Sequence, residues 1–243
     1  MTPEELTTTT FEAIGALGAK YYFHPDTLAV GKELGLDGFR FYVIGRGGVL
    51  GNVESPVVTS AFGYFHPAVI DKMWTSSCEI VEPREAARSS LRCNAALGRK
   101  HLGDVVGLDA FCEAAEAVCA GVNPAGLALF AGYAAEPLPD DEAARALQLI
   151  VTLRELRGSQ HLATIVAAGL HPAVAHALRR PDDLDTFGWA EGVEIPDGAT
   201  AALAAVDATT NKLTAATYQP LNDAQRTALA TGVAAITAAF DNP

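Results

Sequence analysis

Alanine-rich segments in which leucine recurs at helical spacing fill most of this 243-residue chain, and they favour a mainly helical fold. Valine and isoleucine, which strands prefer, are sparse outside a few runs. With 49% hydrophobic residues the chain can bury a sizeable core without disulfides or a metal ion. We therefore predict a mainly α fold, a multi-helix bundle made of two packed helical halves.

Proline and glycine divide the chain into segments of helical length. The segment 38–48 is ambiguous because its apolar residues fit a strand and a helix, and we predict a helix. Residues 181–198, which include Trp189, are expected to form a loop. The predicted helices begin near Pro3 and continue with 25–34, 38–48, 56–64, 67–76, 83–101, 109–120, 124–133, a long helix that ends near 169, then 172–180, 199–216 and 223–240.

The best candidate boundary is the stretch 136–141, which contains two prolines and an acidic pair. It predicts an N-terminal helical half over residues 1–136 and a C-terminal half over 137–243, which can also form one compact domain. Asp140 or Asp141 is expected to cap the long helix that follows.

Polar residues interrupt the apolar stripe of the segment 147–169. Arg154, Gly158 and His161 lie on the face that the apolar residues mark as buried, and Arg157 neighbours His161 four positions earlier. The glycine would open a notch lined by hydrogen-bond donors. The plain alternative is an arginine and a histidine satisfied at a helix–helix contact, where the glycine permits close approach.

A histidine precedes a helix-opening proline at three places, His24, His66 and His171. Capping explains this pattern, since a residue before proline leaves the α region and suits the N-cap position. The functional alternative is that His24 and His66, with Tyr22 and Tyr64 two residues before them, face one cavity.

The net charge of −12 argues against general binding to the phosphate backbone of nucleic acids, so we do not expect a nucleic-acid partner. A basic patch would have to come from one segment, which carries Arg84, Arg88, Arg92, Arg99 and Lys100. The first ten residues do not resemble a signal sequence, and no apolar run approaches 18 residues, so we expect a cytoplasmic protein without a membrane partner. The alanine-rich surface is compatible with a homodimer.

Motifs for established chemistries are mostly missing. The glycine run around Arg46, from Gly45 to Gly51, matches no phosphate-binding pattern and is interpreted as a flexible helix end. The four cysteines form no CxxC pair and no metal-hydrolase, esterase or di-iron motif is present, so we predict no metal site and name no cofactor. His161 or His171 could still bind a haem iron from one side.

Short motifs follow in order along most of the chain: Tyr22-Phe23-x-Pro25, Gly35-Leu36-x-Gly38-Phe39, Gly45-Arg46, Leu50-Gly51-x-Val53, Leu153-Arg154-Glu155-x-Arg157-Gly158-x-x-His161 and Ala167-x-Gly169-Leu170. In these motifs the chain resembles an actinobacterial helix-turn-helix-like family, the SalK-like proteins. The resemblance implies a mainly helical fold with helix-turn-helix-like elements and implies no reaction. The chain departs from the family at Leu156, where a further histidine is common, and at Ser159, where an acidic residue is common. Many members also continue into a winged-helix-like segment, which is a loop followed by alanine-rich helices in this chain.

The function predicted from these features is binding of a small, largely apolar or aromatic molecule with an anionic group. Arginine would hold the anion in a bidentate contact, and the tyrosines would stack or donate hydrogen bonds. Whether the protein is also an enzyme stays open, as do two alternatives, a helix-turn-helix transcriptional regulator and a haem- or tetrapyrrole-binding protein or biosynthetic enzyme. The predicted ligand-binding residues are Tyr22, His24, Arg46, Tyr64, His66, Arg154, Arg157 and His161.

Overall fold

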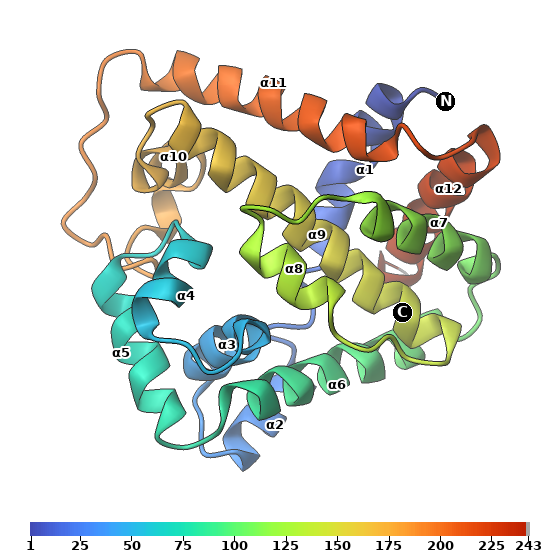
Figure 1. Cartoon of the computed structure of the whole chain (residues 1–243). Coiled ribbons are helices and arrows are strands. Elements are labelled where there is room, and N and C mark those ends of the chain that lie inside the picture. Colours follow the sequence, from blue (N-terminus) through green and yellow to red (C-terminus); the bar gives the residue numbers. More distant parts are fainter. Residues whose placement is uncertain (242–243) are drawn as a thin grey trace.

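The computed structural model of the chain describes residues 1–241, and its regular structure there is entirely helical (Figure 1). The mainly α fold predicted from the sequence is confirmed. Two short 3-10 turns, Gly48–Leu50 and Pro181–Asp183, follow α3 and α10. The helices are α1 Pro3–Leu17, α2 Pro25–Glu33, α3 Gly38–Gly47, α4 Ser55–Phe62, α5 Pro67–Cys78, α6 Pro83–Leu102, α7 Leu108–Gly121, α8 Ala128–Ala134, α9 Glu142–Ala167, α10 Pro172–Arg179, α11 Ala199–Tyr218 and α12 Asp223–Asp241.

Helix α9 is the centre of the fold and crosses the middle of the molecule (Figure 1). It packs against helices that come both before and after it in sequence, namely α1, α6, α7, α8, α10 and α11. Asp141 caps its first turn by accepting a hydrogen bond from the main-chain N–H of Ala144 at 3.0 Å, as the sequence predicts. From Ala144 to Leu156 almost every side chain is buried, the pattern of a helix covered on all sides.

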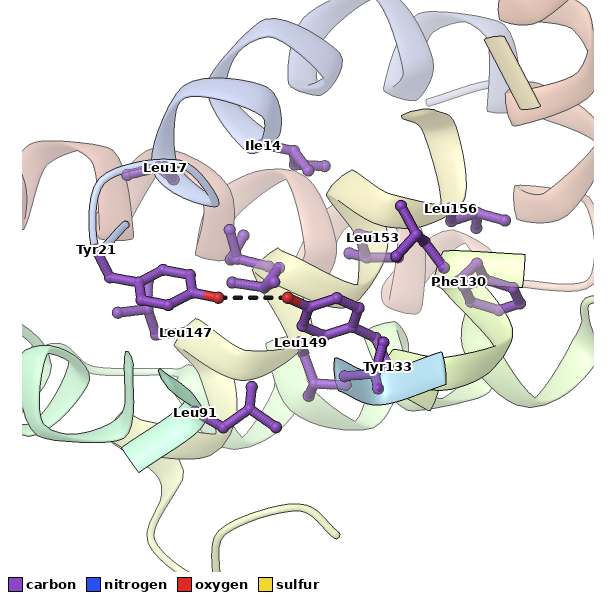
Figure 2. Packing of buried hydrophobic residues seen from close by; sticks show 14 of the residues in the cluster. Ile14, Leu17, Tyr21, Leu91, Phe130, Tyr133, Leu147, Leu149, Leu153 and Leu156 are labelled. Carbon is purple, nitrogen blue, oxygen red and sulfur yellow. Dashed lines mark hydrogen bonds between the residues drawn. The ribbon is translucent and has the colours of Figure 1, made fainter. Parts of the chain in front are cut away.

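The main hydrophobic core surrounds the N-terminal part of α9. Tyr21 and Tyr133 lie fully buried in it with their hydroxyls 3.5 Å apart, enclosed by the leucines of α9 (Figure 2). The pair satisfies both phenolic groups away from water. The same core takes residues from both sides of residue 136, from Leu6 to Ile236. The division of the chain at that point stays a prediction.

The ambiguous segment 38–48 is helical, as predicted. Asp37 caps α3 by accepting hydrogen bonds from the main-chain N–H groups of Phe39 and Arg40. The interpretation of the glycine run as a flexible helix end is wrong for Gly45, Gly47 and Gly48, because these three glycines are buried in helix contacts. A Cβ on Gly48 would lie 2.0 Å from the main-chain oxygen of Pro83, so only glycine lets α3 approach α6 this closely.

Helices α4 and α5 pack against each other and are joined by the short turn 63–66, which starts at Gly63 with φ of +66°. A short, glycine-containing turn between two packed helices is one feature of helix-turn-helix motifs. The predicted loop 181–198 joins α10 to α11 and begins with the 3-10 turn. On its way it passes next to the α4–α5 pair (Figure 1). There Trp189 donates its indole N–H to the main-chain oxygen of Tyr64 at 2.9 Å.

A search of residues 1–241 finds no single helix with the length and apolar character needed to cross a membrane. Helices α9 and α10, which meet at 116°, satisfy the length and composition criteria only as a bent pair.

Two helical glycines allow the close packing of α9 to be tested. A Cβ on Gly98 of α6 would lie 2.6 Å from the main-chain oxygen of Ala143, whereas a Cβ on Gly158 would meet nothing within 4 Å. We expect Gly98→Ala to lower the free energy of unfolding by about 1–3 kcal/mol, because the two helix backbones must separate. Denaturant unfolding followed by circular dichroism measures the change.

Gly158→Ala is the matched control, since it makes the same exchange within a helix. We expect it to raise the free energy of unfolding by up to about 1 kcal/mol through helix propensity alone. Equal effects of the two substitutions would contradict the close approach of α6 and α9.

Candidate functional site

A cavity of about 680 Å³ lies between the C-terminal half of α9 and helices α1, α3, α4, α10 and α11. The loop after α10 contributes Phe187 to its wall, stacked on Phe65 with ring centroids 4.0 Å apart. On its other side Phe187 lies against His176, at 3.9 Å between ring centroids. One part of the wall is therefore a stack of flat rings, and the polar residues gather along α9.

Glu155 lies beneath this cavity and is the most deeply buried charge beside it, with 1% of its side chain exposed. Arg46 of α3 makes a bidentate contact with it, from Nε to Oε1 at 3.1 Å and from Nη2 to Oε2 at 2.8 Å. Arg154 Nη1 and the Tyr22 hydroxyl, at 3.2 Å, also donate to Oε1. Burial alone would raise the pKa of the Glu155 carboxyl, but Arg46 and Arg154 outweigh it and lower the pKa to about 2.

His161 is held at both ring nitrogens. Its Nδ1 lies 3.3 Å from the Tyr64 hydroxyl, and its Nε2 lies 3.1 Å from Oδ1 of Asp207 on α11. Burial, together with the positive charge of Arg157, lowers the pKa of His161 to about 4. The imidazole is therefore neutral at physiological pH, which makes Nε2–H the donor to Asp207 and Nδ1 the acceptor from Tyr64. With both nitrogens engaged, His161 does not fit the role of a haem ligand.

Two polar atoms beside the cavity are buried and have no hydrogen-bond partner within residues 1–241: Nε of Arg157 and Nε2 of His176. Arg157 uses Nη2 to donate to Asn211 at 2.7 Å and packs its guanidinium over the ring of Phe11 at 4.5 Å. His176 is only 7% exposed. Buried polar atoms of proteins are normally satisfied, so a group that enters the cavity can supply what these two lack.

Five of the eight residues predicted for the site line the cavity, namely Arg46, Tyr64, Arg154, Arg157 and His161. Tyr22 does not line the cavity, but it contacts three residues that do, through a hydrogen bond to Glu155 and ring contacts with Arg154 and Tyr42. Gly158 is at the cavity too, but it is exposed, so the close helix contact considered for it is not formed.

The two remaining residues, His24 and His66, lie away from the cavity. Each is the N-cap of its helix and accepts a main-chain N–H at Nδ1, from Asp26 at 3.3 Å and from Ala68 at 3.2 Å. The matched Tyr-x-His pairs therefore do not face one cavity, and capping accounts for both histidines. His171 caps α10 in the same manner.

Sequence reasoning missed several polar residues of the site, among them Asp207, His176 and Arg179. Asp207 accepts from His161 and pairs with Arg179 through its other oxygen. Nothing in the sequence connects a single aspartate in an alanine-rich helix to a histidine 46 residues earlier. Arg179 and His176 share a face of α10, and their spacing of three was the signal available for them.

None of the four cysteines lines the cavity. Burial raises the pKa of Cys112 and of Cys119 to about 12, so both are inert thiols that fill space in α7. Within the described part of the chain no three His, Cys, Asp or Glu side chains are grouped so as to hold a metal ion.

The cluster of Glu155 with Arg46, Arg154 and Tyr22 can be tested by its effect on stability. We expect Glu155→Gln to lower the free energy of unfolding by about 3–5 kcal/mol at pH 7, because two partly buried arginines lose their fully buried counter-charge. The pKa of Glu155 is lower in the folded than in the unfolded chain, so the carboxylate stabilises the fold above about pH 4.5 and loses this effect as the pH falls toward 2. Denaturant unfolding from pH 7 to pH 3 should therefore show the two proteins converging.

Glu85→Gln is the control, because Glu85 forms an exposed ion pair with Arg92. Its effect should stay within about 0.5 kcal/mol at every pH. A difference between wild type and Glu155→Gln that does not change with pH would refute the assigned charge state.

Comparison with known proteins gives one match. A family model described as a helix-turn-helix family matches residues 7–183, which include most of α1, all of α2 to α10 and most of the cavity wall. No curated protein and no solved structure matches the chain significantly. The match covers well over half of the chain. The chain therefore belongs to the helix-turn-helix family.

Proposed function

We propose that this protein binds a small organic anion with an aromatic body in the cavity beside α9. The observation that carries the proposal is the charge of the wall, where five arginines meet three carboxylates in a protein whose net charge is −12. The arginines are Arg46, Arg154, Arg157, Arg179 and Arg180, and the carboxylates are Glu12, Glu155 and Asp207.

The carboxylates do not neutralise every arginine. Glu155 is shared by Arg46 and Arg154, and Asp207 pairs with Arg179. Arg157 contacts only the neutral Asn211 through a hydrogen bond, and its Nε has no partner among residues 1–241. A carboxylate or phosphate at Arg157 would supply the missing acceptor in the bidentate geometry that guanidinium favours.

The apolar part of the ligand would lie against aromatic rings. Phe11, Phe62, Phe65 and Phe187 line the same cavity as the arginines. The guanidinium group of Arg46 lies over the ring of Phe62, 4.4 Å from its centroid, and that of Arg157 lies over the ring of Phe11, at 4.5 Å. A flat ring of the ligand can stack beside these groups while its anion reaches Arg157, and a pocket that is mostly apolar with a few fixed polar groups is the usual form of a small-molecule site.

Calorimetry with 3-phenylpropionate and its neutral analogue 3-phenylpropionamide tests the proposal. We expect the acid to bind at least about tenfold more tightly than the amide, because a charge-assisted hydrogen bond contributes about 1.5–3 kcal/mol. Arg157→Gln should remove most of this preference.

Arg92→Gln is the control, since Arg92 is an exposed arginine of α6 that pairs with Glu85. It should leave both affinities unchanged. Equal binding of the acid and the amide, or full affinity of Arg157→Gln for the acid, would rule out an anion site at Arg157.

The family match favours a second candidate function, contact with DNA through the α4–α5 pair. In α5, the second helix of the pair, the one basic residue is Lys72, and it follows Asp71. Among residues 1–241, the denser basic series in α6 is paired except at Arg88: Arg84 with Glu136, Arg92 with Glu85, Arg99 with Asp141 and Lys100 with Asp26. Neither helix offers the surplus of free cations on which binding to phosphates depends.

We therefore expect no retardation of a random-sequence DNA duplex in a gel-shift assay at 150 mM salt. Retardation that weakens steeply with added salt, and that weakens further in Lys72→Ala, would establish the DNA-binding candidate instead. A basic DNA-binding protein run in parallel verifies the assay.

A further inference from the structure

We propose that Tyr64, His161 and Asp207 form a proton relay that removes a proton from the carbon beside the carbonyl group of an aromatic 2-oxo acid. The inference rests on the proposed function, because the carboxylate of that acid is the anion held at Arg157. To the binding of an anion it adds a reaction, which is enolisation, and a class of substrate, the aromatic 2-oxo acids.

The relay is a continuous chain of hydrogen bonds built from three parts of the fold. Tyr64 comes from the turn between α4 and α5, His161 from α9 and Asp207 from α11. The Tyr64 hydroxyl donates to Nδ1 of His161 at 3.3 Å, and Nε2–H of His161 donates to Oδ1 of Asp207 at 3.1 Å. A hydroxyl, an imidazole and a carboxylate in this order are the arrangement by which hydrolases activate a hydroxyl group.

Both ends of the relay are held in place from outside it. Arg179 pairs with Oδ2 of Asp207, which leaves Oδ1 for the imidazole. The main-chain oxygen of Tyr64 accepts the indole N–H of Trp189 at 2.9 Å, so the loop after α10 fixes the turn that carries the phenol. A side chain that only filled space would not need these constraints, whereas proton transfer depends on them.

The relay opens onto the cavity, since all three of its residues line the wall. The positive charges of Arg46, Arg179 and Arg157 favour negative charge on the phenol, in opposition to the burial that raises the pKa of Tyr64 to about 12. The same arginines stabilise the enolate that develops on the substrate.

The step is balanced without any other reactant. The C–H bond of the substrate breaks and its proton passes to the oxygen of Tyr64, while the hydrogen that Tyr64 carried moves to Nδ1 of His161. The electron pair of the C–H bond becomes the enolate, and the new imidazolium stays in contact with the Asp207 carboxylate. Reversal of the step returns a proton, exchanged with solvent, to the same carbon.

Phenylpyruvate is the probe, because it combines an aromatic ring, a carboxylate and two exchangeable hydrogens on C3. Proton NMR in D₂O measures how fast these hydrogens are replaced by deuterium. We expect the wild-type protein to accelerate the exchange, and we expect Tyr64→Phe to slow the protein-dependent rate at least about 100-fold, as removal of a general acid–base group does. Binding of 3-phenylpropionate should change by less than about threefold, which separates catalysis from affinity.

Tyr133→Phe is the matched control, because it removes the hydroxyl of another buried tyrosine whose partner is Tyr21 in the core. It should exchange phenylpyruvate at the wild-type rate. If the wild type binds phenylpyruvate without accelerating the exchange, or if Tyr64→Phe keeps the acceleration, the relay is refuted while the binding function stands. If 3-phenylpropionate and phenylpyruvate both fail to bind, the proposed function and the relay fall together.

Asp207 acts through His161 and is a positioning residue, so its test needs a readout of the imidazole itself. In the wild type, ¹⁵N NMR of His161 should show the neutral tautomer with hydrogen on Nε2. In Asp207→Asn the amide N–H donates to Nε2, the hydrogen moves to Nδ1, and exchange of phenylpyruvate should fall at least about tenfold. An unchanged tautomer or an unchanged exchange rate in this variant would overturn the role of Asp207.

Discussion

The buried carboxylate of Glu155 is the interaction on which the rest of this structure depends. It lies on the central helix and gathers Arg46 from α3, Arg154 from its own helix and the Tyr22 hydroxyl from the segment after α1. Two guanidinium groups next to an apolar core would be very costly without it, since an unpaired charge cannot be buried. By placing one negative charge between two positive ones, the cluster keeps a net positive charge at the base of the cavity and still satisfies the buried groups. The architecture around α9 and the electrostatics of the cavity thus have a common origin.

The positions of the helices along the chain could largely be predicted from the sequence because helix ends are marked by local chemistry. Asp141 begins α9, and the histidines before prolines begin α2, α5 and α10, each by accepting a main-chain N–H within three residues. The same local chemistry misled the prediction of the site. His24 and His66 have a ring nitrogen committed to the helix end, a role that needs no cavity and that gives the same sequence pattern as a functional pair.

The polar residues of α9 were predictable as a site because they follow one another at helical spacing, but their partners were not. Asp207 comes from α11 and Tyr64 from the α4–α5 turn, and the packing that brings them to His161 depends on contacts between distant parts of the chain. The glycine run near Arg46 shows the same limit. The sequence alone does not distinguish a glycine in a flexible segment from one that a close backbone contact requires. Gly48 is of the second kind, because a Cβ there would lie 2.0 Å from another backbone. Only the second belongs to a rigid wall that can hold Arg46 in place.

In the proposed relay, the charges of the cavity explain how a neutral histidine would accept the proton of Tyr64. Burial and the positive charge of Arg157 hold the pKa of His161 near 4, so the free protein keeps an imidazole that can accept a proton but holds it weakly. An anion bound at Arg157 offsets the very charge that opposes protonation, and an enolate forming nearby adds a second negative charge. Both changes raise the affinity of His161 for the proton at the moment the substrate gives it up. In the proposed reaction the carboxylate of the substrate would thus contribute to its own activation, because the proposed anion site at Arg157 lies four residues, one helical turn, before His161.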